Sequence, residues 1–232
     1  MRFTPLGDRA LTITLGDAID EPTHRRVRAA VALIDARRPA GVVDLVPAFA
    51  SVTVHYDPAR VAGDENEPPY DRIVATLDPL LSGVGTNTLP PARLVEIPVC
   101  YGGELGPDLA GVARHHDLSP QEVVDLHAGA EYLVYMVGFM PGFAYMGGLP
   151  PRIATPRRGT PRTAVPAGTV GIGGQQTGVY PLESPGGWNL IGRTPLRIFD
   201  IDRDEPILLV TGDRARFVPI TQREFERWPN RA

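Results

Sequence analysis

Glycine and proline set the strongest limit on what this chain can fold into, and one uncharged segment concentrates them. Residues 132–151 read YLVYMVGFMPGFAYMGGLPP and contain no charged side chain, and about twenty such residues are enough to cross a membrane. A helix in lipid must satisfy its own backbone, and Pro141 with four glycines would interrupt it repeatedly. The N-terminus, MRFTPLGDR, is charged and has no apolar signal core. We therefore expect a soluble, cytoplasmic chain with no membrane partner.

The second half of the chain consists of short β-prone runs separated by glycine and proline. From residue 132 onward these runs are YLVYMVGF, AVPAGTVGIG, TGVYPL, WNLIG, LRIF, ILLV and ARFVPI. Many short strands at near-regular spacing are typical of a β-sandwich or a β-barrel. Glycine permits the bulges and sharp bends that barrel closure requires. This part of the chain is therefore predicted to be a sandwich or a barrel.

The first ninety residues alternate between strand and helix patterns. Apolar residues repeat at the strand or helix period, which predicts strands over 10–15, 42–46, 51–56 and 93–99, and helices over 20–37 and 69–81. The order β-α-β-β-α-β is the split βαβ pattern, so a small ferredoxin-like α+β domain is predicted for residues 1–90. The run SGVGTNTLPPA, residues 82–92, is predicted to be a linker.

Two short helices are expected within residues 106–127. Ser119 has the position of an N-cap, Pro120 that of the first helical residue, and Glu122 that of the capping-box partner. The pair resembles a DNA-binding helix-turn-helix, but its second helix carries Glu122 and Asp125 and no arginine. Phosphate would repel these acids, so no nucleic-acid partner is expected.

The residue content excludes several kinds of chemistry. All 23 basic residues are arginine, so the chain cannot form a lysine Schiff base, carry biotin on a lysine or build a P-loop. Cys100 is the only cysteine, which rules out an internal disulfide and fits a reducing compartment. The five histidines do not follow any metal-ligand spacing, so no metal site is expected.

Four arginines lie close together before the glycine-rich β region. Arg152, Arg157, Arg158 and Arg162 fall within eleven residues that contain no acid. A guanidinium binds a carboxylate or a phosphate through two parallel hydrogen bonds. Arg157, Arg158 and Arg162 are therefore candidates for binding an anionic substrate, with Arg162 the leading one because it directly precedes a predicted strand. A solvated loop or a contact between subunits is the alternative.

A glycine-rich run, GTVGIGGQQTG, occupies residues 168–178. It lacks the last glycine of the dinucleotide-binding pattern, and no helix follows it. We therefore expect turn glycines rather than a phosphate loop. Gln175 and Gln176 would then form a polar wall able to orient a substrate.

Glu183 is the only charged residue between Thr163 and Gly192. A carboxylate isolated among apolar residues could act as a catalytic acid or base, and tying down loop amides is its alternative role. Trp188 and Asn189 follow a Pro-Gly-Gly turn and could line the mouth of a pocket. A core position is the alternative for Trp188.

Four long blocks carry a family resemblance: EIPVCYGGELGPDL, VYMVGFMPGFAYMGGLP, TPRRGTPRTAVPAGTVGIGGQQTGVYPLESPGGWNLIGRTP and GDRARFVPI. Over essentially the whole chain they closely resemble the allophanate hydrolase subunit 1 family, which also includes the Kip inhibitor and the B subunits of 5-oxoprolinase. The resemblance implies a small N-terminal domain, residues 1–90, and a cyclophilin-like β-barrel domain, residues 91–232. The glycines of 138–151 would let the backbone fold closely around a pocket or a partner surface, on which Phe139, Phe143 and Tyr145 supply apolar and stacking area.

The resemblance also implies an activity and partners. Family members act with a homologous cyclophilin-like second subunit and a third subunit as an ATP-dependent 5-oxoprolinase, a lactam hydrolase that opens 5-oxoproline to glutamate. We therefore expect a non-autonomous enzyme subunit, with ATP used by the assembled complex and not bound tightly by this chain alone. A Kip-type inhibitor of a sensor histidine kinase and a subunit of a urea carboxylase or allophanate-type assembly are the alternatives. Amidase-type hydrolysis is not expected, because it uses a lysine that is absent here.

Overall fold

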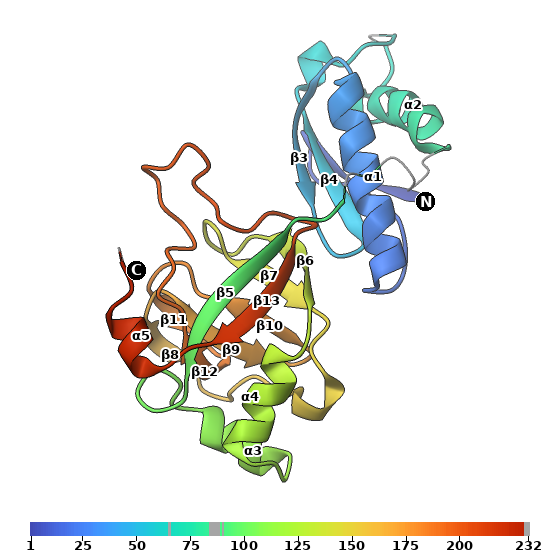
Figure 1. Cartoon of the computed structure of the whole chain (residues 1–232). Helices are drawn as coiled ribbons and strands as arrows, with labels where there is room; N and C mark the ends of the chain where they lie inside the picture. Colours follow the sequence, from blue (N-terminus) through green and yellow to red (C-terminus); the bar gives the residue numbers. More distant parts are fainter. Residues whose placement is uncertain (65, 84–88, 90, 230–232) are drawn as a thin grey trace. The chain divides into compact units, whose positions relative to one another are not determined.

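The chain forms two compact units, Met1–Pro91 and Ala92–Ala232 (Figure 1). The computed structural model describes residues 1–64, 66–83, 89 and 91–229. The predicted linker, residues 82–92, includes residues 84–88 and 90, which lie outside the described ones. Within the described part of the chain, each helix is too short or too polar to cross a membrane.

The N-terminal unit is a four-stranded antiparallel sheet packed against two helices. The sheet order is β1-β2-β4-β3, with bounds β1 (Arg2–Pro5), β2 (Ala10–Thr14), β3 (Val42–Pro47) and β4 (Ser51–Tyr56). Alternate residues of β4, such as Val52 and Val54, point into the core, where they meet Ile34 of α1 (Glu21–Arg37) and Ile73 of α2 (Pro69–Leu81). A 3-10 turn, η1 (Pro58–Arg60), precedes α2. Both predicted helices are therefore confirmed. They could be predicted because their apolar positions repeat at the helical period.

The predicted ferredoxin-like topology is not confirmed, because its last strand belongs to the other unit. The segment predicted at 93–99 is β5 (Leu94–Tyr101), which pairs with β12 (Asn189–Arg193) and β13 (Arg214–Pro219) in the second unit. The sheet edge beside β2 is instead occupied by β1, which the sequence analysis did not predict. Four residues are too few for a strand period to stand out from the surrounding chain.

The second unit contains a closed barrel with strand order β10-β7-β6-β13-β5-β12-β9. Its other strands are β6 (Tyr132–Val137), β7 (Ala144–Gly147), β9 (Thr169–Gly173), β10 (Gln176–Val179), β12 (Asn189–Arg193) and β13 (Arg214–Pro219). Strand β13 runs parallel to β5, from Arg214 opposite Leu94 to Pro219 opposite Val99, and the other barrel pairs are antiparallel. The barrel alternative of the sequence prediction is therefore the correct one.

Short elements surround the barrel (Figure 1). They are α3 (Leu109–His115), α4 (Pro120–Ala128), α5 (Gln222–Glu226), the 3-10 turn η2 (Pro151–Ile153) and a two-stranded sheet of β8 (Arg162–Val165) and β11 (Ser184–Gly186). The predicted capping box of α4 is present: Ser119 Oγ accepts from the Glu122 backbone, and Glu122 accepts from the Ser119 backbone at 2.8 Å.

Helix α4 places His127 in the barrel interior, where the imidazole is fully buried. The Tyr101 hydroxyl lies 2.8 Å from Nδ1, and Thr177 Oγ1 lies 2.9 Å from Nε2. Thr177 donates its own hydrogen to the Gly171 carbonyl at 3.0 Å, so its oxygen must accept from Nε2–H while Nδ1 accepts from Tyr101. Burial lowers the pKa of His127 to about 3, which agrees with this neutral tautomer. Both ring nitrogens are thus satisfied by the protein.

Candidate functional site

A pocket of about 270 Å³ lies between β7, β11 and the loops that precede β8 and β12. Its floor is aromatic: Phe143, Tyr180 and Trp188 are all buried. Its rim carries Arg157 and Arg158, and the remaining lining residues are Phe139, Tyr145, Pro161, Pro185, Gly186 and Gly187. Five of the predicted site residues therefore come together here: Phe143, Tyr145, Arg157, Arg158 and Trp188.

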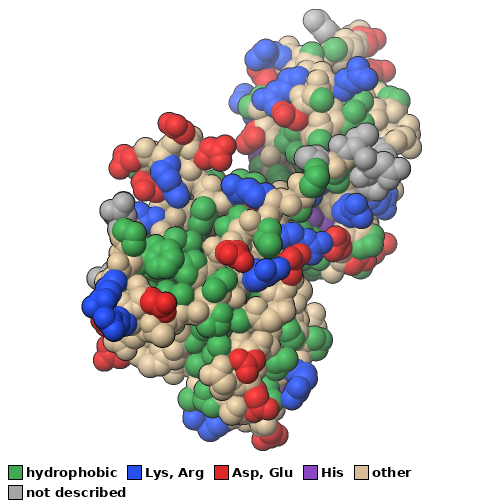
Figure 2. Space-filling view, in the orientation of Figure 1, with side chains coloured by type: hydrophobic (Ala, Val, Ile, Leu, Met, Phe, Trp, Pro, Cys, Tyr) green, Lys and Arg blue, Asp and Glu red, His purple; other side chains and the backbone are tan. Residues whose placement is uncertain are grey.

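Phe139 differs from the floor because it stands in solvent. Its side chain is 67% exposed, whereas that of Phe143 is 2% exposed, and the two rings meet edge to face at 5.7 Å. Figure 2 shows one face of the barrel unit, on which hydrophobic side chains lie interspersed with charged ones. Single exposed apolar residues are ordinary. A bulky side chain on a residue with a positive φ, here 71°, is uncommon, so the backbone at Phe139 is strained.

Trp188 is held against glycines of the neighbouring strands. An added Cβ would lie 2.5 Å from Trp188 Nε1 at Gly173, 3.1 Å from its ring at Gly178 and 3.2 Å from its Cβ at Gly171. These three glycines lie in β9 and β10, so the prediction that they are turn glycines is wrong for them. Gly174, with φ 65°, does occupy the turn. The glycine-rich run therefore provides a close-fitting seat for the indole.

Asp108 joins two arginines of the cluster to the strand that follows Trp188. Its Oδ1 accepts from Arg162 Nη2 at 2.8 Å and from Arg158 Nη1 at 3.1 Å, and its Oδ2 accepts from the Leu190 backbone at 2.7 Å. Burial raises the pKa of this carboxyl, but the hydrogen bonds from Arg162 and Leu190 and the two positive charges bring it below its ordinary value. No acid lies beside the cluster in the sequence, because Asp108 precedes Arg158 by 50 residues.

Arg157 and Arg162 occupy different surroundings. The guanidinium carbon of Arg157 lies 5.8 Å from the centre of the Trp188 ring, and no ion pair joins Arg157 to a residue that the structure describes. Arg162, by contrast, lies outside the residues that line the pocket. Its Nη1 is buried without a hydrogen-bond partner among the described residues.

The other predicted site residues lie outside the pocket lining. Gln175 is exposed in the turn between β9 and β10, and Gln176 begins β10 half-buried. Glu183 is exposed, so the apolar surround expected around its carboxylate is not present. Asn189 donates to the Pro156 carbonyl at 2.9 Å, which ties the arginine loop to β12. The substrate and catalytic roles of these four residues stay predictions.

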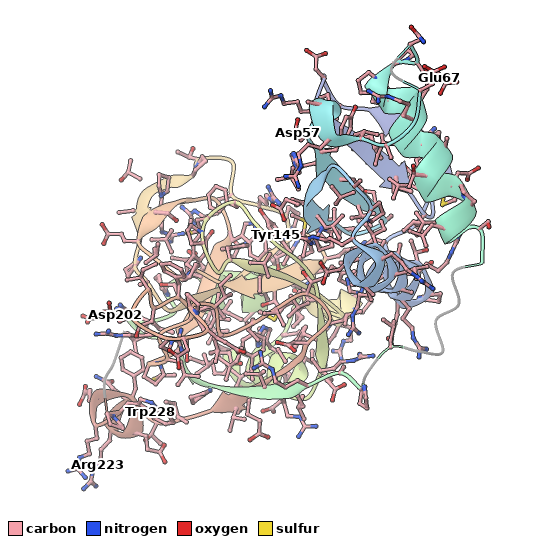
Figure 3. All side chains as sticks on the ribbon, turned by 90° about the horizontal axis from the view of Figure 1, so that it is seen from above. Asp57, Glu67, Tyr145, Asp202, Arg223 and Trp228 are labelled. Carbon is pink, nitrogen blue, oxygen red and sulfur yellow. The ribbon has the colours of Figure 1, made fainter. Side chains whose placement is uncertain are left out.

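Tyr180 is a pocket residue that the sequence analysis missed, because nothing in the run TGVYPL distinguishes its tyrosine. Burial raises the pKa of its hydroxyl, partly offset by a hydrogen bond with the Trp188 backbone and by the charges of Arg157 and Arg162. The hydroxyl is therefore protonated at neutral pH and available as a donor. Figure 3 labels Tyr145, which contributes to the same aromatic cluster from β7.

The described residues do not contain a group of three or more His, Cys, Asp or Glu side chains able to hold a metal ion. Cys100 is buried in β5, and burial raises the pKa of its thiol. A buried thiol of this kind behaves as a small apolar side chain. The site chemistry therefore rests on the aromatic floor, the arginines and Tyr180.

Comparison with known proteins identifies the family. The family model for the carboxyltransferase domain, subdomain C and D, matches residues 1–209. The 5-oxoprolinase B subunit of Bacillus subtilis (strain 168) is 44% identical over 226 residues, 96% of this chain and 94% of that protein. The 5-oxoprolinase B subunit of Escherichia coli O157:H7 is 46% identical over 92% of this chain and 94% of that protein.

A solved structure agrees with these sequence matches. The crystal structure of TTHA0988 superposes on 97% of this chain with a TM-score of 0.80 and 37% identity. This chain spans 41% of that longer protein. The chain therefore belongs to the carboxyltransferase-domain family that contains the B subunits of 5-oxoprolinase.

Proposed function

We propose that this chain is the B subunit of an ATP-dependent 5-oxoprolinase, and that it works only in complex with other subunits. The observation that carries the proposal is 44% identity to the B. subtilis protein over 96% of this chain and 94% of that protein. A match of this extent includes both compact units rather than one shared module. ATP-dependent work also favours the cytoplasm, where ATP is supplied.

The pocket supports the proposal through its chemistry. 5-Oxoproline carries a flat lactam next to a carboxylate, and the pocket offers an aromatic floor beneath an arginine rim. Hydrolysis adds one water across the lactam C–N bond and yields glutamate, while a second water converts ATP to ADP and phosphate. In this proposal the chain binds and orients the small acid. To the Tyr180 hydroxyl, which lines the pocket, we assign the role of donor to an oxygen that gains negative charge.

Two partner subunits complete the proposed enzyme, namely a homologous cyclophilin-like second subunit and a third subunit. Of the two surfaces expected for Phe143, a pocket or a partner contact, the pocket is the one that fits, because Phe143 is buried within this chain and lines the pocket. Phe139 is the exposed aromatic residue of the same segment, so we assign the partner contact to it. ATP belongs to the assembled complex, since this chain has neither lysine nor a P-loop.

The test is co-expression of this chain with the two partner subunits, followed by an assay of ATP hydrolysis with and without 5-oxoproline. We expect hydrolysis to depend on 5-oxoproline and on all three subunits, and glutamate to form in proportion to ADP. Urea serves as the competing substrate for a carboxylase-type assembly. A stable three-subunit complex that hydrolyses ATP with urea but not with 5-oxoproline would contradict the proposal. Inhibition of a sensor histidine kinase by the chain alone would favour the Kip-type alternative.

A further inference from the structure

We propose that Arg157 alone, among the clustered arginines, binds the anionic group of the ligand in the aromatic pocket. Asp108 fixes two of the other three arginines, Arg158 and Arg162, as positioning residues, and Arg152 lies outside the pocket lining. The ligand class is a small acid with one carboxylate beside a single flat ring. Only the identity of that ring as a lactam rests on the proposed function.

Charge is distributed unevenly among Arg157, Arg158 and Arg162. One carboxylate oxygen of Asp108 accepts hydrogen bonds from both Arg158 and Arg162. The other oxygen accepts a hydrogen bond from the backbone N–H of Leu190. Asp108 is only 12% exposed and Arg162 only 25% exposed, so the charge-assisted bond between them is shielded from water and strong. The bond from Arg158, whose side chain is 39% exposed, is weaker but still directs Nη1 to Asp108. Both arginines are therefore anchored before any ligand arrives. Arg157 has no such anchor among the described residues.

The placement of Arg157 also suits it to bind an anion in the pocket. Its guanidinium lies over the Trp188 ring at 5.8 Å, within the range of a cation–π contact. Trp188 itself is held by the glycines of β9 and β10, so it forms a rigid platform. The face of the Trp188 ring attracts the Arg157 guanidinium without engaging the N–H donors of that guanidinium. Arg157 is thus held at the pocket rim with its fork free for a carboxylate.

The size of the pocket also suits a small acid. The pocket volume of about 270 Å³ lies just below the usual range of small-molecule sites, roughly 300–1,000 Å³. A single ring with one carboxylate suits that space, whereas a nucleotide with three phosphates requires more room. The pocket is therefore assigned to the small acid and not to ATP.

Arg162 is the competing candidate, because its buried Nη1 lacks a partner among the described residues. It does not line the pocket, however, and its Nη2 is held by Asp108. Lysine at this position would keep the charge and one bond to Asp108. If Arg162 only positions the loop, Arg162→Lys should alter thermal stability more than ligand affinity.

The test uses Trp188 fluorescence in the full chain. The chain has two tryptophans, and Trp228 follows α5, apart from the pocket residue Tyr145 (Figure 3), so Trp228→Phe leaves Trp188 as the only reporter. The probes are 5-oxoproline, cyclopentanecarboxylate, which keeps a ring and the carboxylate, and 2-pyrrolidinone, which lacks the carboxylate. We expect a saturable change with both acids and none with 2-pyrrolidinone.

In the same background, Arg157→Gln should weaken binding of both acids at least about tenfold, because the charged fork is lost. Arg162→Lys should keep the affinity within about threefold. The absence of a saturable change in the parent protein, equal affinity in Arg157→Gln, or a larger loss in Arg162→Lys would each overturn the proposal. Binding of cyclopentanecarboxylate together with inactivity of the assembled complex on 5-oxoproline would refute the proposed function while leaving the assignment of Arg157 intact.

Discussion

The barrel interior around His127 and the pocket around Trp188 both bring polar side chains against buried aromatic rings, yet they treat those polar groups differently. His127 has a protein partner on each ring nitrogen and packs against Phe217 at 4.5 Å. The pocket keeps a guanidinium over Trp188 without an acid to pair it among the described residues. A buried polar group whose hydrogen bonds are all made within the protein, such as His127, indicates a structural role. A charged group without an ion-pair partner at a pocket, such as Arg157, indicates a ligand.

This contrast is sharpest for substitution of His127, where we expect the largest loss of stability. His127→Leu removes two hydrogen bonds from a fully buried site and leaves the Tyr101 and Thr177 hydroxyls without their imidazole partner. The free energy of unfolding should fall by about 3 kcal/mol, measured by urea denaturation of the full chain. The exposed His115 provides the matched control, and His115→Leu should change stability by less than about 0.5 kcal/mol. Equal effects of the two changes would remove the structural distinction.

The neutral state of His127 also predicts acid sensitivity. Its pKa is about 3 in the folded chain against an ordinary value of 6.5, so the unfolded chain takes up the proton first. The stability contribution is therefore complete above pH 6.5 and is lost as pH falls toward 3. By pH 5 this residue should account for a loss of about 2 kcal/mol.

Urea denaturation at pH 7 and pH 5 measures this effect as the difference between the parent chain and His127→Gln. The variant should lose less stability on acidification than the parent, since glutamine does not titrate. The same pH dependence in both proteins would show that other groups cause the acid sensitivity.

Local patterns were predicted well, whereas long-range contacts were not. The capping box at Ser119 and Glu122 and the helix over Pro69–Leu81 follow from neighbouring residues, so sequence alone specifies them. The pairing of Asp108 with Arg162 spans 54 residues and leaves no local signal. The arginine cluster was therefore found, but the division of roles within it was not.

The packing of Trp188 against glycines is a second long-range contact that the sequence does not predict. Glycines in GTVGIGGQQTG could serve turns or close contacts, and only the position of the Trp188 ring decides between them. Strand β1 was missed because its four residues are too few to show a strand period. Strand β5 was counted in the N-terminal pattern because a strand pattern does not specify its pairing partner. Sequence predicts elements better than it predicts which side chains meet.

Gly173→Ala tests the packing of Trp188 against β9 directly. Its effect on the free energy of unfolding should lie between those of the changes at His127 and Phe139. The new Cβ would lie 2.5 Å from Trp188 Nε1, so the indole must move away from β9. We expect a loss of about 1.5 kcal/mol in the free energy of unfolding and weaker binding of 5-oxoproline by the chain. Gly159→Ala is the control, because a Cβ there meets nothing within 4 Å. Normal ligand affinity in Gly173→Ala would show that the close packing of Trp188 against β9 is not needed for ligand binding.

The smallest stability effect is expected at the pocket rim, where Phe139 combines exposure with a strained backbone. At φ 71° a residue with a side chain costs roughly 1–2 kcal/mol, which glycine avoids. The greater freedom of glycine in the unfolded chain offsets about 0.5–1 kcal/mol of that gain. Phe139→Gly also loses the contact with Phe143, so its free energy of unfolding should match that of the parent to within about 1 kcal/mol. Phe139→Ala keeps the strain and loses the contact with Phe143, so it should be the less stable variant.

Both changes at Phe139 remove the aromatic rim, so both should weaken 5-oxoproline binding or assembly with the partner subunits. Urea denaturation orders the stabilities, while co-purification and Trp188 fluorescence report function. An alanine variant more stable than the glycine variant would show that the backbone at Phe139 is unstrained. Full function in both variants would show that the exposed ring has no part in the pocket or in the partner contact.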